Sequence, residues 1–239
     1  METFEWVDAA GDVHAIPNIE WDIAGRGGAP GLVALRSIAS GHGSTVLSHR
    51  DGPRPITIPF GIAESTPEAL RDEVIAWANR FSTRRGYGTL RVTHHSGVRW
   101  QIPAIPTAFD APDRRGENDL RQQRCVVALT APSPYWESAI ESGTSFTGAA
   151  APSSWFPFGL PGPELVSSQI IGASTVTNLG TVDAHPRWVI TGPADSLLLA
   201  NDTTGLELEL PQAISAGDTV TVETAPPEPF IEDDLGASL

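Results

Sequence analysis

The residues best suited to metal binding or acid–base chemistry in this sequence are its six histidines. None of them belongs to a His-Glu-x-x-His motif, and no two are four residues apart, the spacing at which two imidazoles on one helix face can share a zinc ion. His94 and His95 are adjacent, so on a strand they would point to opposite sides and could not hold one ion together. We therefore predict no metal site and no cofactor.

Nucleophilic catalysis is supported no better, because a serine or cysteine nucleophile needs a base and an orienting group beside it in space. The sequence has no Gly-x-Ser-x-Gly elbow, and His42 and Ser44 share a short loop in which such a pair rarely forms. Cys125 lies in an apolar stretch and is expected in the core. The glycine-rich residues 25–31 lack the phosphate-loop patterns and are expected to form a flexible or interface loop. We predict that the chain is not an enzyme.

The elements that carry these residues are mainly short strands, because apolar runs alternate with turn residues. In the N-terminal part the runs predict strands at residues 4–6, 13–16, 21–23, 33–38, 45–47, 56–60, 88–94, 98–102 and 120–130. The first two runs flank Gly11 and Asp12 as a hairpin, and Pro59 is expected at a sheet edge or a strand end.

One helix is predicted over residues 66–81. Thr66 suits the N-cap and Pro67 the first helical position, and Gly86 is expected to end the helix. The apolar positions recur every three or four residues, which predicts one stripe packed on a sheet. They are Leu70, Val74, Trp77 and Phe81.

The C-terminal part is expected to be an antiparallel β-sandwich, because it consists of short strands at regular spacing. The runs predict strands at residues 174–179, 188–191, 196–200, 206–210 and 219–224. In residues 206–210 leucines alternate with glutamates, so the leucines are expected to face inward. Residues 201–205 are expected to form a hairpin loop with Gly205 at a positive φ. Five strands are few for a sandwich, so a further strand must come from the tail or from a neighbour.

Charge changes sharply along the chain, whose 29 acidic and 15 basic residues, all arginine, give a net charge of −14. Residues 1–150 carry 17 acids and 14 arginines, a net charge of −3, whereas residues 151–239 carry 12 acids and only Arg187, a net charge of −11. We predict a domain over residues 1–140, a linker rich in Gly, Ser and Pro over residues 141–163, and a second domain over residues 164–239 whose completeness stays open.

The composition also excludes several classes of function. An acidic chain lacks the positive surface that grips nucleic acid, and no run approaches the ~20 apolar residues that span a membrane. The first twelve residues contain no Lys or Arg and do not form a signal peptide, and the lone cysteine allows no internal disulfide. We expect no stable nucleic-acid binding and no membrane insertion.

Short motifs also follow one another along the chain in a characteristic order. A β-rich region precedes a single helix, and a long strand then runs into Ser133, Pro134, Tyr135 and Trp136. Beyond the linker come residues 178–180, 185–193, Asn201, Thr203, Thr204, Gly205, 206–210, Gly217 and Asp218, with the strand that follows at 219–222. This order resembles the distal tail protein family of bacteriophages with long, non-contractile tails, whose members often have Asp where this chain has Ser133. The similarity covers nearly the whole chain.

This resemblance implies a tail-tube-like N-terminal domain, a β-sandwich or split barrel with one flanking helix, and a galectin-like C-terminal β-sandwich. It implies a homo-hexameric ring that joins the tail tube protein to the tail hub, the tip and other minor tail proteins, and that leaves a channel for DNA. The chain would then belong to the virion tail and be assembled in the host cytoplasm. Family members often continue beyond the strand that follows Asp218, so the end at Leu239 leaves any glycan binding open.

For such a ring, we predict that loops rich in Gly and Arg reach an acidic neighbouring copy. The candidate interface residues are Arg26, Gly27, Gly28, Arg50, Asp51 and Arg54. The alternative is a carbohydrate-binding module that contacts the host surface, with Trp155 or Trp188 stacked on sugar rings. A hydrolase of unrecognised type is a third hypothesis.

Overall fold

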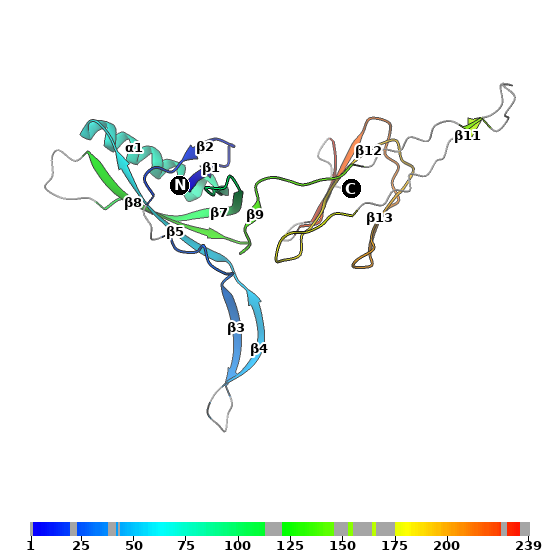
Figure 1. Cartoon of the computed structure of the whole chain (residues 1–239), viewed down its shortest axis with the longest axis horizontal. Coiled ribbons are helices and arrows are strands. Elements are labelled where there is room, and N and C mark those ends of the chain that lie inside the picture. The colour runs from blue at the N-terminus through cyan, green and yellow to red at the C-terminus, as the bar shows by residue number, and fades with distance from the viewer. Residues whose placement is uncertain are drawn as a thin grey trace. The chain divides into compact units, whose positions relative to one another are not determined.

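The computed structural model describes residues 2–19, 23–37, 42, 44–112, 121–145, 153–154, 164–165, 175–225 and 229–234. The chain divides into two compact units, Met1–Ser142 and Gly143–Leu239. The described residues form antiparallel sheets and one α-helix, which confirms the predicted mainly-β class (Figure 1). No helix within these ranges is long and apolar enough to cross a membrane.

The first unit is built on a seven-stranded antiparallel sheet with the order β2-β1-β6-β7-β8-β5, in which β9 also pairs with β7. The strands are β1 (Thr3–Val7), β2 (Val13–Ala15), β5 (Arg54–Ala63), β6 (Gly88–Thr93), β7 (Arg99–Asp110), β8 (Gln122–Ala131) and β9 (Glu137–Ser138). The predicted β1–β2 and β6–β7 hairpins are both confirmed. The predicted strand at 21–23 falls mostly outside the described residues, and Ile23 lies outside any strand.

Strand β7 has 12 residues, more than twice the length of the predicted strand at 98–102. Its first half, up to Ala104, pairs with β6, and its second half, from Ile105, pairs with β8 around a bulge after Pro106. Prolines cannot donate to a sheet ladder, so they hide a strand from pattern reasoning, and a bulge is a position that tolerates one. Pro59 likewise lies in the middle of β5 rather than at its end, although β5 is the last strand in the sheet order.

Helix α1 (Pro67–Arg80) covers one face of this sheet (Figure 1). The hydroxyl of Thr66 accepts a hydrogen bond from the amide of Ala69 at 3.2 Å, which confirms the predicted N-cap. The helix ends at Arg80, so Gly86 instead follows a short 3-10 helix, η1 (Thr83–Arg85). The predicted stripe is confirmed, since three of its four residues are buried and Val74 is half-buried against the core.

The core of the first unit lies between α1 and the sheet. The Trp77 ring lies 5.4 Å from both the Phe60 ring and the Phe81 ring, centroid to centroid. The remaining buried core residues are Phe4, Trp6, Ile16, Ile56, Ile58, Ile62, Leu70, Leu90, Val92, Ile102, Ala104, Cys125, Val127, Leu129 and Ala131. Cys125 is fully buried, as expected.

Strands β3 (Gly31–Ser37) and β4 (Ser44–Asp51) pair as a separate two-stranded sheet, which we call the β3–β4 hairpin. Both strands are longer than the predicted runs at 33–38 and 45–47. The register shifts after Ala34, because Ala34 lies opposite Ser48 and Leu35 lies opposite Val46. Leu47 is therefore the extra residue of a β-bulge.

The second unit combines a three-stranded sheet, β12-β15-β16, with the two-stranded pairs β13-β14 and β10-β11. Their bounds are β10 (Ser153–Ser154), β11 (Glu164–Leu165), β12 (Arg187–Thr191), β13 (Leu197–Asn201), β14 (Leu206–Leu210), β15 (Thr219–Glu223) and β16 (Phe230–Asp233). The tail thus supplies the further strand, β16. The predicted strand at 174–179 is wrong for its described residues, 175–179, which form no strand.

The core of the second unit is much smaller than that of the first. Four of its described hydrophobic residues are buried, namely Leu210, Ile214, Val220 and Val222. The leucines of β14 differ in burial. Leu210 is buried, as expected, but Leu206 is 71% exposed, which contradicts the expectation that it faces inward. Most of the predicted linker, residues 141–163, falls outside the described residues.

Candidate interaction site

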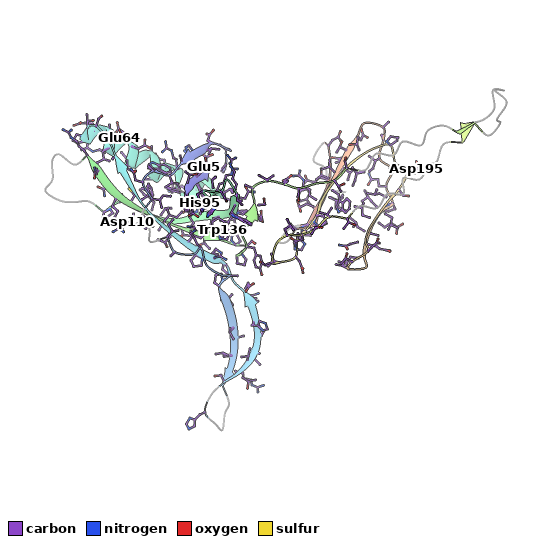
Figure 2. The ribbon with its side chains drawn as sticks, in the orientation of Figure 1. Glu5, Glu64, His95, Asp110, Trp136 and Asp195 are labelled. Atoms are coloured by element: carbon purple, nitrogen blue, oxygen red, sulfur yellow. The ribbon has the colours of Figure 1, made fainter. Side chains whose placement is uncertain are left out.

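The β3–β4 hairpin exposes apolar side chains that a monomer of this size would ordinarily cover. Every described side chain of the two strands is exposed, and each strand makes its main contacts with the other (Figures 1 and 2). Five aliphatic residues of the hairpin are 44–61% exposed, namely Leu32, Val33, Leu35, Val46 and Leu47. Exposed aliphatic side chains gathered on one hairpin in this way are typical of a protein–protein contact.

The register divides the hairpin into two faces of different chemistry. Residues directly opposite each other in an antiparallel pair share a face, and alternate residues along a strand change face. Val33, Leu35 and Val46 therefore lie on one face, which we call the apolar face. His49 lies on the same face, because it is paired with Val33. Leu32, Arg36 and Arg50 form the basic face, and neither arginine has a hydrogen-bond or ion-pair partner in the described part of the chain.

The base of the hairpin is held by Arg54, the first residue of β5. Its Nε donates to the carbonyl oxygen of Pro134 at 2.6 Å, and its Nη1 donates to the carbonyl oxygens of Gly25 at 2.6 Å and Gly27 at 2.7 Å. Arg54 is only 3% exposed. The prediction that Arg54 reaches a neighbouring copy therefore lacks the exposed side chain that it needs, because the guanidinium is used inside the subunit.

A second contact joins the same segments. The hydroxyl of Tyr135 donates to Oδ2 of Asp51 at 2.5 Å, and this hydrogen bond raises the pKa of Tyr135 above its ordinary value. Trp136 follows and packs its indole partly buried against the core of the first unit (Figure 2). Of the residues that suggested a family motif at 134–136, Pro134 and Tyr135 thus contact the hairpin base and Trp136 contacts the core.

Arg26, also predicted at the interface, is engaged within the subunit as well. Its two guanidinium nitrogens donate to the two carboxylate oxygens of Glu2 at 2.7 and 3.0 Å, and the hydrogen bond lowers the pKa of Glu2. The guanidinium carbon also lies 5.4 Å from the centre of the Phe4 ring. Gly27 and Gly28 are exposed with open space around their α-carbons, so they leave the loop surface accessible.

Sequence reasoning found the residues of the hairpin base but missed the apolar face. The signal was present: the run Leu32-Val33-Ala34-Leu35 is apolar on both strand faces, whereas a strand covered on one side should alternate. The hairpin has no buried side, so the run marks a surface that a partner would cover rather than a core strand.

The second group of predicted motif residues forms turns of the second unit. The side chain of Asn201 accepts from the amides of Thr203 at 3.0 Å and Thr204 at 3.2 Å, and Gly205 has a φ of +69°, as expected. Gly217 has a φ of +93° immediately before Asp218. These residues shape loops, and their contacts in the described part indicate no chemistry beyond that.

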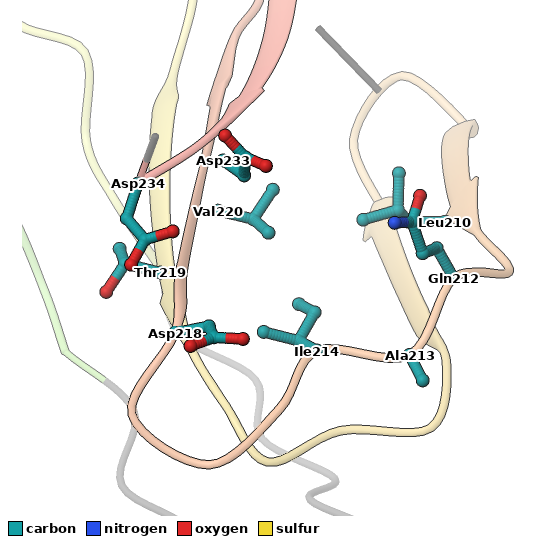
Figure 3. A pocket seen from close by; sticks show the side chains of 9 residues that line it. All are labelled: Leu210, Gln212, Ala213, Ile214, Asp218, Thr219, Val220, Asp233 and Asp234. Carbon is teal, nitrogen blue, oxygen red and sulfur yellow. The ribbon is translucent and has the colours of Figure 1, made fainter. Parts of the chain in front are cut away.

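One pocket of the second unit has a volume of about 350 Å³. Leu210, Ile214 and Val220 form its apolar part, and Asp218, Asp233 and Asp234 lie around it (Figure 3). The residues that line it include no aromatic side chain of the kind that stacks on sugars. The described residues contain no group of three or more His, Cys, Asp or Glu that could hold a metal ion.

The structure also places the remaining candidates for chemistry. His94 follows β6 and His95 lies in the turn before β7, where the predicted hairpin puts the turn, and their ring centres are 3.7 Å apart. Trp188, a candidate for stacking on sugars, is half-buried against the core of the second unit. Trp155, the other candidate, lies outside the described residues.

No protein-family model matches the chain, and no curated protein matches it either. Among solved structures, the Dit protein of phage SPP1, presented as a paradigm of the hub adsorption apparatus in phages that infect Gram-positive bacteria, aligns with 100% of this chain and 85% of its own at 14% identity and a TM-score of 0.61. Chains of the phage p2 baseplate in its activated conformation, with strontium or with calcium, align with 100% of this chain and 86% of their own at 10% identity and TM-scores of 0.51 and 0.52. At these identities the likeness establishes the shared fold alone.

Proposed function

We propose that this chain is a structural component of a bacteriophage tail, a distal tail protein that associates with copies of itself in a ring between the tail tube and the hub. Two kinds of observation support this proposal. The fold is shared with a phage hub protein and with chains of a phage baseplate, and the β3–β4 hairpin exposes a surface that needs a partner.

The exposed hairpin is the observation that carries the proposal. An isolated two-stranded hairpin is at best marginally stable in water, because it buries too little apolar surface to offset the ordering of its backbone. This hairpin has 15 residues in its two strands and no described side chain that is buried. Burial of its apolar face against another subunit would supply the missing stabilisation.

A ring built from identical subunits needs two different surfaces on each subunit, so that each copy contacts the next in the same way until the ring closes. The hairpin supplies the first surface. Its basic face carries Arg36 and Arg50, which have no hydrogen-bond or ion-pair partner among the described residues, while the chain as a whole has a net charge of −14. An acidic surface of a second copy is therefore the complementary partner that we propose, as expected for Arg50 and the Arg26–Gly28 loop.

The resemblance in motif order supplies the remaining parts of the proposal. These are six copies in the ring, the galectin-like character of the second unit, and the contacts with the tube protein, the tip and the minor tail proteins. The channel for DNA follows in the same way, and an acidic ring suits it because like charge keeps phosphate from binding. We propose a non-enzymatic role in the virion tail, reached by assembly in the host cytoplasm. The carbohydrate-binding alternative gains no support from Trp188 or from the pocket beside Asp218.

Native mass spectrometry of the full chain tests the proposal, alone and mixed with the tail tube protein of the same phage. We expect closed oligomers, with six copies as the dominant species, which dissociate as the salt concentration rises because the basic face contributes to the contact. A chain that stays monomeric in both mixtures at all concentrations would contradict the proposal. Binding to a glycan array by such a monomer would favour the carbohydrate-binding alternative.

A further inference from the structure

Three segments that are far apart in sequence meet at the base of the β3–β4 hairpin. Gly25 and Gly27 precede the hairpin, Asp51 ends it and Arg54 follows it, and Pro134 and Tyr135 come after β8 on the way out of the first unit. Arg54 contacts the first and the third of these segments through three hydrogen bonds of 2.6–2.7 Å. The Tyr135–Asp51 hydrogen bond joins the second and the third.

The chemistry of Arg54 is unusual for a residue that only fills space. A guanidinium that is 3% exposed is expensive to bury, and such a charge is usually paired with a carboxylate. Arg54 forms no ion pair in the described part of the chain and is held by backbone carbonyl oxygens alone. Because a planar guanidinium donates in fixed directions, these bonds determine how the three backbone segments lie relative to one another.

The segment that receives these bonds leads directly to the boundary between the units. Trp136 and β9 follow Tyr135, and the first unit ends at Ser142. No other described element packs on the hairpin, so the contacts at its base set its direction. The same few contacts therefore reach both the hairpin and the path into the second unit.

We infer that Arg54 and Tyr135 form a clamp that couples the direction of the β3–β4 hairpin to the segment 134–138. A neighbouring subunit that binds the hairpin then also fixes the direction in which the chain leaves the first unit. This inference rests on the proposed function, since it assigns the hairpin to a neighbouring copy. Arg54 and Tyr135 act as positioning residues: they touch the backbone of the segments that they orient, and they do not touch the neighbour.

Distance measurements between pairs of spin labels on the full chain test the clamp. In a Cys125→Ala background, one label pair joins the hairpin to the helix through Thr45→Cys and Asn79→Cys. A second pair joins the segment after β9 to the same helix position through Ile140→Cys. All three labelled positions are exposed, so the labels need not disturb the core.

The clamp variants are Arg54→Met, Tyr135→Phe and Asp51→Ala. Tyr87→Phe is the matched control, because Tyr87 is the other tyrosine of the chain and is 58% exposed. Arg71→Met on the exposed side of α1 controls for loss of an arginine. Circular dichroism and thermal unfolding verify that each variant is folded, and Tyr135→Phe and Asp51→Ala keep the test available if Arg54→Met does not fold.

We expect each label pair to give the same distance distribution in the parent protein and in both controls. In the clamp variants both distributions should broaden, and the informative case is Asp51→Ala, a change on the hairpin side that should broaden the distribution measured at Ile140. If a folded Asp51→Ala or Tyr135→Phe variant broadens neither distribution, or only the one nearest the substitution, the coupling is overturned.

The same samples separate this inference from the proposed function. Distances are measured on single subunits in dilute solution, whereas self-association is measured by native mass spectrometry at higher concentration. If the parent protein assembles and the clamp variants keep its distance distributions, the proposed function is retained and the clamp is overturned. A parent protein that never assembles loses the proposed function, and the distances still decide whether the clamp exists.

Discussion

Replacement of the apolar face by threonine should strongly weaken self-association without unfolding the subunit. The variant is Val33→Thr, Leu35→Thr and Val46→Thr, which keeps residues suited to β-strands and removes apolar surface. The three side chains are 55%, 59% and 56% exposed. Complete burial of such a side chain contributes about 1.5–3 kcal/mol, so the half that is still exposed can contribute about 1 kcal/mol each, or about 3 kcal/mol per interface. That corresponds to roughly a hundredfold weaker association.

Sedimentation velocity over a range of concentrations measures this loss, and thermal unfolding measures the stability of the subunit. Because the three side chains make no core contacts, unfolding should shift by no more than about 0.5 kcal/mol. The matched control is Val189→Thr with Leu198→Thr, two strand residues of the second unit that are 63% and 60% exposed. Association that is unchanged in the triple variant, or weakened equally in the control, would refute the assignment of the hairpin as the contact.

Three further predictions concern single residues of the first unit. Burial raises the pKa of Asp8, but hydrogen bonds from His14 and from two backbone amides together lower it by a larger amount. The net pKa of Asp8 is therefore below its ordinary value of 3.8. The ionised Asp8 therefore stabilises the fold fully above about pH 4, and this stabilisation is lost as the pH falls through the folded pKa. Asp8→Asn should lower the free energy of unfolding by about 1–3 kcal/mol at neutral pH, and should make that free energy depend less on pH in the acidic range, as measured by urea unfolding. Burial raises the pKa of the Cys125 thiol to about 11, so iodoacetamide at pH 8 should alkylate it only after denaturation, as followed by mass spectrometry, and rapid native labelling would contradict its burial. Gly25→Ala should lower the melting temperature, since Gly25 has a φ of +90° and an added Cβ would meet the Pro55 carbonyl oxygen, whereas Gly28→Ala, with open space, should not.

Local signals in the sequence were sufficient wherever one element decided the outcome. The helix was predicted within one residue at each end, because its N-cap, its first-position proline and its apolar stripe all report on the same fourteen residues. The hairpins β1–β2 and β6–β7 were found from their turns. The length of β7 was underestimated because the strand contains Pro103 and Pro106, and because the register of its second half depends on β8, which the sequence pattern alone does not bring beside it.

The hairpin base shows why residue roles were harder to predict than elements. Arg54 was singled out with Arg50 and Asp51 as a candidate interface residue, since a glycine- and arginine-rich loop suggested a contact. In the structure its guanidinium instead binds the carbonyl oxygens of Gly25 and Pro134, 29 and 80 residues away in sequence. Nothing in the local pattern distinguishes an arginine that reaches a neighbour from one that binds three backbone segments of its own subunit.

The structure of the hairpin also favours binding to a specific partner over non-specific association. Two exposed strands present unpaired backbone edges, which proteins commonly protect with charged residues and bulges. This hairpin has both devices, Arg36 and Arg50 on its basic face and the bulge at Leu47, which twists the ladder and opposes edge-to-edge pairing. Its apolar side chains, by contrast, are left uncovered on the other face. A surface that blocks pairing through its edges and offers burial through one face is suited to a subunit that closes on a single kind of neighbour, because only a partner with a matching face gains the full burial energy.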